Sequence, residues 1–501
     1  MPSPNINIMI DRESEEPIYK QLIRQIQMQI ESGSLPAGTR LPASRTLAKK
    51  IDVSRISVVN AYAELRAEGF LSAHAGRGTF VAKDNSAAAH TTASANGNNP
   101  QAENNNNLPD QSMRNLMRLA RRQGVINFSH GAPPPEFFPI PHLRDAINTV
   151  LDRDGASALT YEMTEGYGPL RSAIRDYVSA LGIQVRPANV LITGGAQQAI
   201  DLVIQSLVAE GQTIVTANPT YIGMIDIART RRINIHGIPM DEHGIRLDLL
   251  EHYLMEKTPR LIYVMPSFQN PTGQVMPLHR RRQLLNLSIK YNVPILEDAI
   301  YHEFRFEGES LPPLKALDEH NSVIHVSAFT KMLLPGMRIG YLIADGNQFE
   351  RLVRVKQSAD ISTSALNQRA IHLMMQRGIL SRQLERNNRE LRRRRDAALA
   401  AAAEYLPPGT RWNVPEGGLY LWAQLPKTGP TAAELFIAAV QNQVAFAIGN
   451  IFHLNGGGTY HMRLNYGLQP PEYITEGFRR IGRAWRNLAC DYDELDKSPL
   501  L

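Results

Sequence analysis

The sequence of 501 residues contains a single cysteine, Cys490. One thiol can close no internal disulfide and supplies too few ligands for a cysteine-based zinc site, so we expect no metal site. No run of about 18 consecutive apolar residues occurs, which argues against a membrane-spanning helix. The N-terminus lacks a basic segment followed by a long apolar one, so we expect no secretory signal and a cytoplasmic protein.

The composition is that of a globular protein. Hydrophobic residues make up 43% of the chain and charged residues 20%, which allows a sizeable core and excludes disorder throughout. At about 150 residues per domain, the length corresponds to roughly three domains. The net charge of +6 permits an anionic partner without naming one.

The positive charge is concentrated near the N-terminus. Residues 17–83 hold ten Lys or Arg and only four Asp or Glu. A solvated basic surface and a nucleic-acid surface explain such an excess equally well. The order of the predicted elements in this segment has to decide between them.

A polar segment divides the chain. Residues 84–111 contain eight Asn, two Pro and one large apolar residue, Leu108, too little apolar surface to offset the entropy lost on ordering. We therefore predict a flexible tether at 84–111, between an N-terminal domain at 12–83 and a body at 112–501.

The N-terminal domain shows helical spacing followed by a short hairpin. The spacing predicts helices over 17–34, 44–51 and 54–69, with Ser44 and Ser54 as N-caps, and two short strands within 70–82. Val58, Tyr62 and Leu65 should face the core. This order of elements is that of a winged helix-turn-helix, whose third helix enters the major groove of double-stranded DNA.

Several polar residues lie at the exposed ends of these elements. Arginine and hydroxyl side chains in such places can reach base edges or phosphates. The predicted DNA-binding residues are Arg45, Ser54, Arg55, Ser57 and Arg77. The stretch GTRLPASRTLAKKIDVSRISVVNAYAELRAEGFL, with the wing GRGTFV, closely resembles the DNA-binding domain of GntR-family regulators.

The body alternates strand-like apolar runs with helical patterns. Among these runs are NVLITGG, RLIYVMPSFQNPTG, VPILEDAIY and VIHVSAFTK. Such alternation predicts a mostly parallel sheet covered by helices. Ligands bind at the carboxyl ends of the strands in sheets of this kind.

Polar residues at these strand ends fit one cofactor. Lys331 can form a Schiff base with a carbonyl if its pocket is partly desolvated. Asp298 ends a hydrophobic strand and needs a cationic partner, such as a protonated pyridine nitrogen. Asn270 and Tyr301 can hydrogen-bond a phenolic oxygen. Each of these residues alone has an ordinary structural explanation.

The remaining groups suit a phosphate and an aromatic ring. Gly195, Ala196 and Gln197 open a helix directly after a strand, which is a ready anion site. Arg338 can neutralise the same phosphate, and Tyr221 can stack on a ring. Together the residues predict a pocket for pyridoxal 5′-phosphate.

The motifs TGGAQQA, NPTY, QNPTG, EDAIY, TKMLLPGMRIGY and HMRLNYG occur in this order, and residues 125–485 resemble a fold-type I aminotransferase. The resemblance implies an α/β fold with a large α/β lobe and a smaller C-terminal α+β lobe. It makes Lys331 the Schiff-base lysine and Arg463 the clamp of an effector carboxylate. It also implies a homodimer in which Tyr161 reaches the partner's phosphate.

One position departs from the family pattern. The residue three before the lysine, usually Ser or Thr, is Ala328. A phosphate-binding hydroxyl is then missing unless Ser327 or Thr330 replaces it. Loss of the cofactor is therefore a further hypothesis.

Taken end to end, the chain resembles the MocR/GabR subfamily of transcriptional regulators. The resemblance implies a regulator that senses pyridoxal phosphate, or an amine or amino-acid effector, through imine exchange at Lys331. The alternative is a catalytically active aminotransferase with an appended DNA-binding domain, and partial transaldimination activity is compatible with either. We interpret the basic run 392–395 as a solvated face or an interface rather than a second DNA surface.

Overall fold

The computed structural model describes residues 8, 10, 18–31, 34–67, 70–74, 78–82, 124–131 and 133–496. The predicted tether 84–111 and Arg77 lie outside these residues. Within the part of the chain that is described, no helix is both long and apolar enough to cross a membrane.

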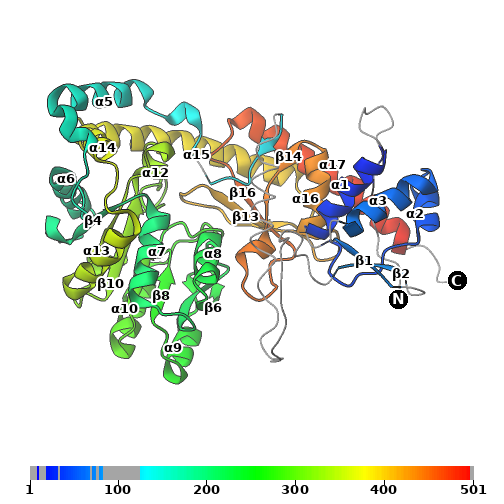
Figure 1. Cartoon of the computed structure of the whole chain (residues 1–501), viewed down its shortest axis with the longest axis horizontal. Coiled ribbons are helices and arrows are strands. Elements are labelled where there is room, and N and C mark those ends of the chain that lie inside the picture. The colour runs from blue at the N-terminus through cyan, green and yellow to red at the C-terminus, as the bar shows by residue number, and fades with distance from the viewer. Residues whose placement is uncertain are drawn as a thin grey trace.

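The N-terminal domain contains three helices and a hairpin. In chain order they are α1 (Ile18–Glu31), α2 (Ser44–Lys50), α3 (Arg55–Ala67), β1 (Leu71–His74) and β2 (Gly78–Val81). The two strands pair antiparallel, with Leu71 opposite Val81. This is the predicted winged helix-turn-helix, drawn in blue in Figure 1.

The N-terminal domain has its own core. Leu22, Leu47, Val58 and Leu65 are fully buried in a cluster that draws only on residues 8–81. The Tyr62 hydroxyl donates a hydrogen bond to the Pro42 carbonyl (3.0 Å). The inward orientation predicted for Val58, Tyr62 and Leu65 is thus confirmed.

The two predicted N-caps have different outcomes. Ser54 precedes α3, and its hydroxyl accepts from the Ser57 amide (3.1 Å), as predicted. Ser44 is instead the first residue of α2, and the preceding Ala43 makes no side-chain cap bond. The prediction for Ser44 was wrong because the helix begins one residue earlier in the chain than a cap at Ser44 requires.

The large lobe is built on an eight-stranded sheet of order β4-β11-β10-β9-β8-β5-β6-β7. The strands are β4 (Val190–Thr193), β5 (Thr213–Asn218), β6 (Asn234–Asp241), β7 (Gly244–Ile245), β8 (Leu261–Val264), β9 (Ile295–Asp298), β10 (Val323–Ala328) and β11 (Gly340–Ile343). Strands β10, β9, β8, β5 and β6 run parallel. Strand β11 is antiparallel to both neighbours. A mostly parallel sheet is confirmed.

Helices cover this sheet, so most of its strands are buried and read as continuous apolar runs, whereas β6 is only partly buried. They are α5 (Ile140–Asp154), α6 (Gly168–Ser179), α7 (Ala196–Leu207), α8 (Ile222–Thr230), α9 (Leu247–Glu256), α10 (Leu278–Tyr291), α11 (Leu314–Leu317), α12 (Phe329–Met332), α13 (Gly346–Asp360) and α14 (Ala365–Gln376).

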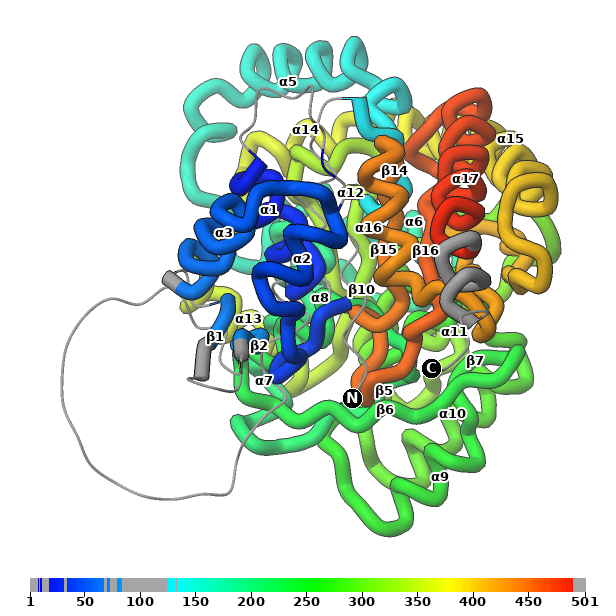
Figure 2. Tube along the Cα trace, turned by 90° about the vertical axis from the view of Figure 1, so that its right-hand side faces the viewer, coloured from blue at the N-terminus to red at the C-terminus, as the bar shows by residue number. Residues whose placement is uncertain are grey.

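The small lobe joins an antiparallel sheet to two long helices and a shorter one. Its sheet has the order β12 (Arg411–Trp412), β13 (Tyr420–Gln424), β16 (His461–Asn465) and β15 (Ala447–Ile448). The helices α15 (Ile379–Tyr405), α16 (Ala432–Gln441) and α17 (Pro471–Asp496) lie together in Figure 2. Strand β3 (Ile126–Asn127) pairs in parallel with β14 (Val444–Ala445). Both lobes therefore match the predicted fold class.

The basic run 392–395 on α15 is only partly a solvated face. Arg392 and Arg393 are exposed, whereas Arg394 and Arg395 are buried. Arg394 pairs with Glu136 (2.9 Å), and Arg395 makes a two-pronged pair with Glu307 (2.7 and 2.8 Å). The two buried arginines join α15 to neighbouring loops, because a buried charge needs a partner.

We predict that the N-terminal domain and the body unfold separately. Leu22→Ala removes a fully buried side chain from the N-terminal core, and Leu296→Ala does so in β9 of the large lobe. Each should cost about 2–5 kcal/mol of unfolding free energy. In differential scanning calorimetry, each variant should lower a different transition. A single transition lowered by both variants would contradict separate unfolding.

Candidate functional site

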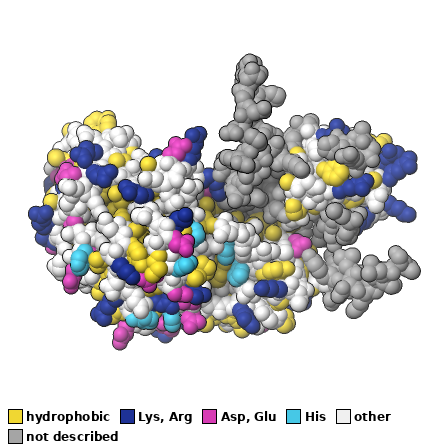
Figure 3. Space-filling view, turned by 90° about the horizontal axis from the view of Figure 1, so that it is seen from below, with side chains coloured by type: hydrophobic (Ala, Val, Ile, Leu, Met, Phe, Trp, Pro, Cys, Tyr) yellow, Lys and Arg dark blue, Asp and Glu magenta, His cyan; other side chains and the backbone are white. Residues whose placement is uncertain are grey.

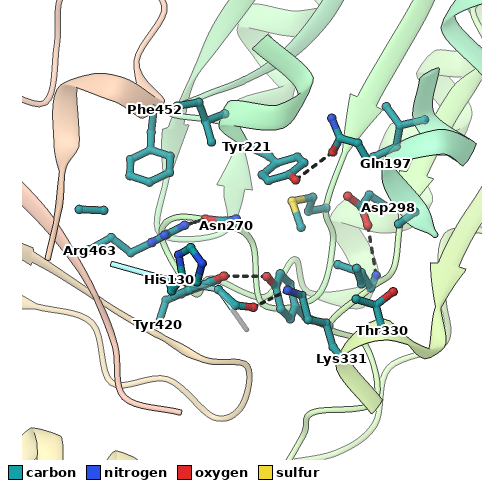
Figure 4. Close-up of a pocket in the computed structure, with 18 of the residues that line it drawn as sticks. His130, Gln197, Tyr221, Asn270, Asp298, Thr330, Lys331, Tyr420, Phe452 and Arg463 are labelled. Carbon is teal, nitrogen blue, oxygen red and sulfur yellow. Dashed lines mark hydrogen bonds between the residues drawn. The ribbon is translucent and has the colours of Figure 1, made fainter. Parts of the chain in front are cut away.

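A cavity of about 280 Å³ lies between the two lobes. Most of the predicted body residues line it: Ala196, Gln197, Tyr221, Asn270, Asp298, Tyr301, Thr330, Lys331, Arg338 and Arg463. Figure 4 shows Lys331 and Asp298 on one side and Arg463 with Phe452 on the other. The structure therefore brings together residues that lie far apart in the sequence.

Lys331 lies on the short helix α12, directly after β10. Its ammonium donates a hydrogen bond to the Gly131 carbonyl. Burial, together with the nearby Arg463 and Arg338 charges, lowers the pKa of Lys331 to about 8, while Asp298 opposes the change. A substantial fraction of this amine is therefore unprotonated, and nucleophilic, at moderately alkaline pH.

Asp298 is the last residue of β9 and is almost fully buried. The Tyr263 hydroxyl donates to its Oδ2 (2.8 Å), and the Ile300 amide donates to its Oδ1 (3.2 Å). Burial nevertheless raises the pKa of Asp298 to about 6. A cationic group in the cavity beside this carboxylate would restore its charged form.

The N-terminus of α7 faces the cavity. Its N-cap, Gly195, has φ +107°, and a Cβ there would lie 2.7 Å from Arg338 Nη2. Arg338 Nη2 donates to the Gly194 carbonyl (2.8 Å). The guanidinium and the unpaired first-turn amides of a helix together form an anion site. Only glycine leaves room for this arrangement.

Tyr221 precedes α8 and lines the upper wall of the cavity in Figure 4. Its hydroxyl donates to Gln197 Oε1 (3.0 Å), and Gln197 Nε2 donates to the Gly223 carbonyl (3.2 Å). These bonds hold the phenol ring in place, so it presents a fixed aromatic surface to the cavity.

Arg463 on β16 is buried, and its plane is fixed on both sides. The guanidinium carbon lies 4.3 Å from the Tyr420 ring centroid and 4.7 Å from that of Phe452. Nη1 donates to Asn270 Oδ1 (2.6 Å) and Nη2 to the Ser129 carbonyl (2.7 Å). Its Nε is buried without an acceptor. An orphan donor of this kind calls for a ligand acceptor.

Residues 129–131, which we call the strap, cross the cavity wall. Their three consecutive carbonyls accept from Arg463, Asn465 and Lys331, in that order. A Cβ at Gly131 would lie 2.5 Å from the Tyr420 hydroxyl oxygen. The strap therefore requires glycine at 131 and ties the small lobe to the lysine of the large lobe.

Sequence reasoning missed the strap, Tyr420 and Phe452. The Tyr420 and Tyr301 hydroxyls lie 2.7 Å apart, so Tyr420 also positions a predicted site residue. The strap acts through backbone carbonyls, which leave no pattern of side chains in the sequence. Tyr420 could not be placed either, because it lies on a small-lobe strand far in sequence from the cofactor motifs. The run EGGLY, with glycines packed against Phe268, was the one signal available.

Ala328 lacks the hydroxyl that usually binds the phosphate at this position, and Ser327 and Thr330 are the two candidates to replace it. Ser327 does not line the cavity, and its hydroxyl is hydrogen-bonded to Tyr341 on β11. Thr330 Oγ1 is buried, has no partner, and belongs to a residue of the cavity wall. Of the two candidate replacements, the structure brings only Thr330 to the site.

Other predicted residues lie elsewhere. Tyr161 is 83% exposed and does not reach this cavity within its own chain, so its role across a dimer stays a prediction. Arg45 and Arg55 are exposed on the N-terminal domain, whereas the Ser54 and Ser57 hydroxyls bond each other (2.9 Å). Among the described residues, no group of three or more His, Cys, Asp or Glu is placed to hold a metal.

Comparison with known families matches both parts of the chain. Residues 123–481 match the family model "Aminotransferase class I and II", and residues 18–81 match "Bacterial regulatory proteins, gntR family". An HTH-type transcriptional regulator of Bacillus subtilis, YdfD, is 29% identical over 94% of this chain and 97% of its own length.

Two further proteins are informative. The probable rhizopine catabolism regulatory protein MocR of Rhizobium meliloti is 27% identical over 87% of each chain. The crystal structure of LysN, an α-aminoadipate aminotransferase of Thermus thermophilus complexed with N-(5′-phosphopyridoxyl)-L-leucine, has a TM-score of 0.71. It is 37% identical and covers 76% of this chain and 95% of its own.

We predict that Lys331 reacts with amine reagents at unusually low pH. In cofactor-free protein, labelling by trinitrobenzene sulfonate should be half-maximal near pH 8, against about 10.4 for an ordinary lysine. Asp298→Asn should lower the midpoint and Arg338→Ala should raise it, because these charges act in those directions. Mass spectrometry quantifies the label. Lys290, whose pKa is raised by Glu251, is the internal control; a Lys331 midpoint near that of Lys290 would contradict the prediction.

Proposed function

The chain belongs to the aminotransferase class I and II family and carries a gntR-family DNA-binding domain, and from this premise we propose that it is a DNA-binding regulator whose body senses pyridoxal 5′-phosphate or an amine effector. Its whole-length relatives are named as transcriptional regulators. The observation that carries the sensing proposal is the set of groups in the cavity: a lysine of lowered pKa, a buried carboxylate, an anion site and an arginine with an orphan Nε.

The cofactor of this family, pyridoxal 5′-phosphate, fits the residues present. Thr330 Oγ1 is a buried hydroxyl without a partner, on a residue that lines the same cavity as Ala196 and Arg338. Asp298 is a buried carboxylate whose raised pKa asks for a cationic neighbour. When bound, the cofactor supplies an aldehyde that condenses with primary amines and a ring that delocalises charge.

The residues divide the cofactor among them. Lys331 would hold it covalently, and Asp298 would share the proton of the pyridine nitrogen. Asn270 and Tyr301 would bind the phenolic oxygen, and Tyr221 would cover the ring. The phosphate would be bound by Gly195, Ala196, Gln197, Thr330 and Arg338, and in a homodimer by Tyr161 of the partner subunit.

Arg463 indicates a carboxylate on the effector. Its guanidinium is clamped between two aromatic rings, which fixes the plane in which a carboxylate can pair. The cavity wall around it is mainly apolar, from Ala447, Ile451 and Phe452. We therefore propose an amine effector that carries one carboxylate near Arg463.

The strap supplies a route from the cavity to the DNA-binding domain. Lys331 donates to the Gly131 carbonyl, and Arg463 donates to the Ser129 carbonyl. A cofactor bound to Lys331 would compete with the first hydrogen bond, and a carboxylate bound to Arg463 would compete with the second. The strap follows β3 closely in the sequence, at the N-terminal end of the described part of the body. Ligand occupancy thereby biases the conformation at the attachment of the paired DNA-binding domains.

The second candidate function is catalysis. The set Lys331, Asp298 and Arg463 is complete, and LysN, an aminotransferase, is 37% identical to the body. An active aminotransferase with an appended DNA-binding domain uses the same residues for turnover. The two functions differ in whether amine binding changes DNA affinity or sustains product formation.

We expect amine-dependent DNA binding without sustained turnover. Holoprotein is titrated with leucine, phenylalanine and γ-aminobutyrate while the cofactor absorbance and the anisotropy of labelled duplex DNA are followed. One amine should change both signals, and borohydride should fix the cofactor on Lys331. Lys331→Ala should keep DNA binding and lose the amine response, because only the body is altered. Steady keto-acid production without sequence-selective DNA binding would favour the enzyme.

Thr330→Val should weaken cofactor binding about tenfold. One hydrogen bond to a charged group is worth about 1.5–3 kcal/mol, and we expect the lower end of this range because other donors also bind the phosphate. Ser327→Ala is the matched control, because its hydroxyl is bonded to Tyr341 away from the cavity. Equilibrium dialysis of the cofactor measures both. Equal losses in the two variants would contradict the assignment of Thr330.

A further inference from the structure

Helix α3 exposes a short apolar strip. Ile56 is 71% exposed and Val59 43%, while Val58, Ala61, Tyr62 and Leu65 of the same helix are buried. Residues 56 and 59 are three apart, so their side chains are neighbours on one helix face. Exposing such side chains forgoes burial energy, which suggests a partner.

The hydroxyls first expected to read DNA are already engaged. The Ser54 hydroxyl accepts from the Ser57 amide and bonds the Ser57 hydroxyl. These bonds stabilise the first turn of α3, on the exposed side of the helix, and contact of the two hydroxyls with DNA stays a prediction. Beside these serines, the N-terminal half of α3 exposes Arg55, Ile56, Val59 and Asn60.

The surroundings of the strip select its occupant. Arg45, Lys49 and Arg55 are exposed close to it in the sequence and on adjoining helices, and residues 17–83 carry a clear positive excess. Figure 3 shows hydrophobic side chains beside Lys and Arg on the N-terminal domain. The major groove combines anionic walls with the thymine C5-methyl, the one apolar group on its floor.

We propose that Ile56 and Val59 read thymine methyl groups in the major groove, with Asn60 on an adjacent adenine. The proposal rests on the DNA-binding function proposed above and adds a base preference to it. Aliphatic contact suits the thymine methyl, and an asparagine amide can pair with adenine N6 and N7. Arg55 then lies one residue from the strip, where it can bond a guanine or a phosphate.

The test uses the full-length holoprotein. A duplex is first selected from a random-sequence library, and each thymine is then replaced singly by deoxyuridine, which lacks only the methyl. At one or two positions, affinity should fall about fourfold for each methyl that loses its contact. In Ile56→Ala and Val59→Ala that penalty should disappear at the same positions, a coupling that a double-mutant cycle isolates.

Ile289→Ala is the matched control, an exposed isoleucine on α10 of the body, and should leave the thymine–uracil difference intact. Replacing adenine by 7-deazaadenine, which lacks N7, should weaken binding in the parent and not in Asn60→Ala. Arg55→Ala should lower affinity about 5- to 150-fold if Arg55 contacts a guanine, and equally for all sequences if it contacts a phosphate. In both cases the methyl effect should remain.

The outcomes separate the two proposals. A selected duplex that is insensitive to every uracil substitution overturns the methyl readout and leaves the regulator intact. Failure to select any duplex overturns the proposed DNA-binding function itself. If Ile56→Ala and Val59→Ala change the sedimentation coefficient but not the uracil penalty, the strip is a protein interface and the inference is wrong.

Discussion

The arrangement of the two lobes depends on the hydrogen bonds made by two buried cationic side chains, Lys331 and Arg463, beside one cavity. Lys331 and Arg463 are placed where water is scarce, and an unpaired charge there is costly. The structure offers them the Gly131 and Ser129 carbonyls of the strap. Because one cation belongs to each lobe, satisfying both fixes the lobes against each other. The same two contacts make the strap sensitive to any ligand that engages either cation.

The cavity has more cationic than anionic side chains and therefore attracts anions. Lys331, Arg338 and Arg463 line it together with one buried carboxylate, Asp298. Burial and the two arginines lower the pKa of the lysine, and burial raises that of the carboxylate. Both shifts favour the neutral form of the group in the ligand-free protein, and both are of the kind that an anionic ligand with a cationic ring would reverse. The cavity is thus prepared electrostatically for a ligand of that description.

Much of the fold was predictable because it follows from local patterns. Strand ends followed by Lys331, Asp298 or the Gly194–Gly195 turn could be placed in one cavity, since parallel strands end at a common edge. Contacts between the lobes were not predictable in this way. Tyr420 approaches Tyr301 across 119 residues of sequence, and the strap acts through backbone carbonyls. Ser44 shows the same limit on a small scale, because a cap depends on where the helix begins.

The tight packing at Gly131 predicts how a mutation at this position would be inherited. Any side chain there meets the Tyr420 hydroxyl, yet nothing in the N-terminal domain's own core depends on it. If the chain is the regulator proposed above, a missense allele at this codon would leave DNA binding intact and abolish the response to the effector. Because the proposed regulator is a homodimer, most dimers in a cell that expresses both alleles would contain at least one altered subunit. Such an allele would be expected to behave as dominant, with a phenotype unlike that of a deletion.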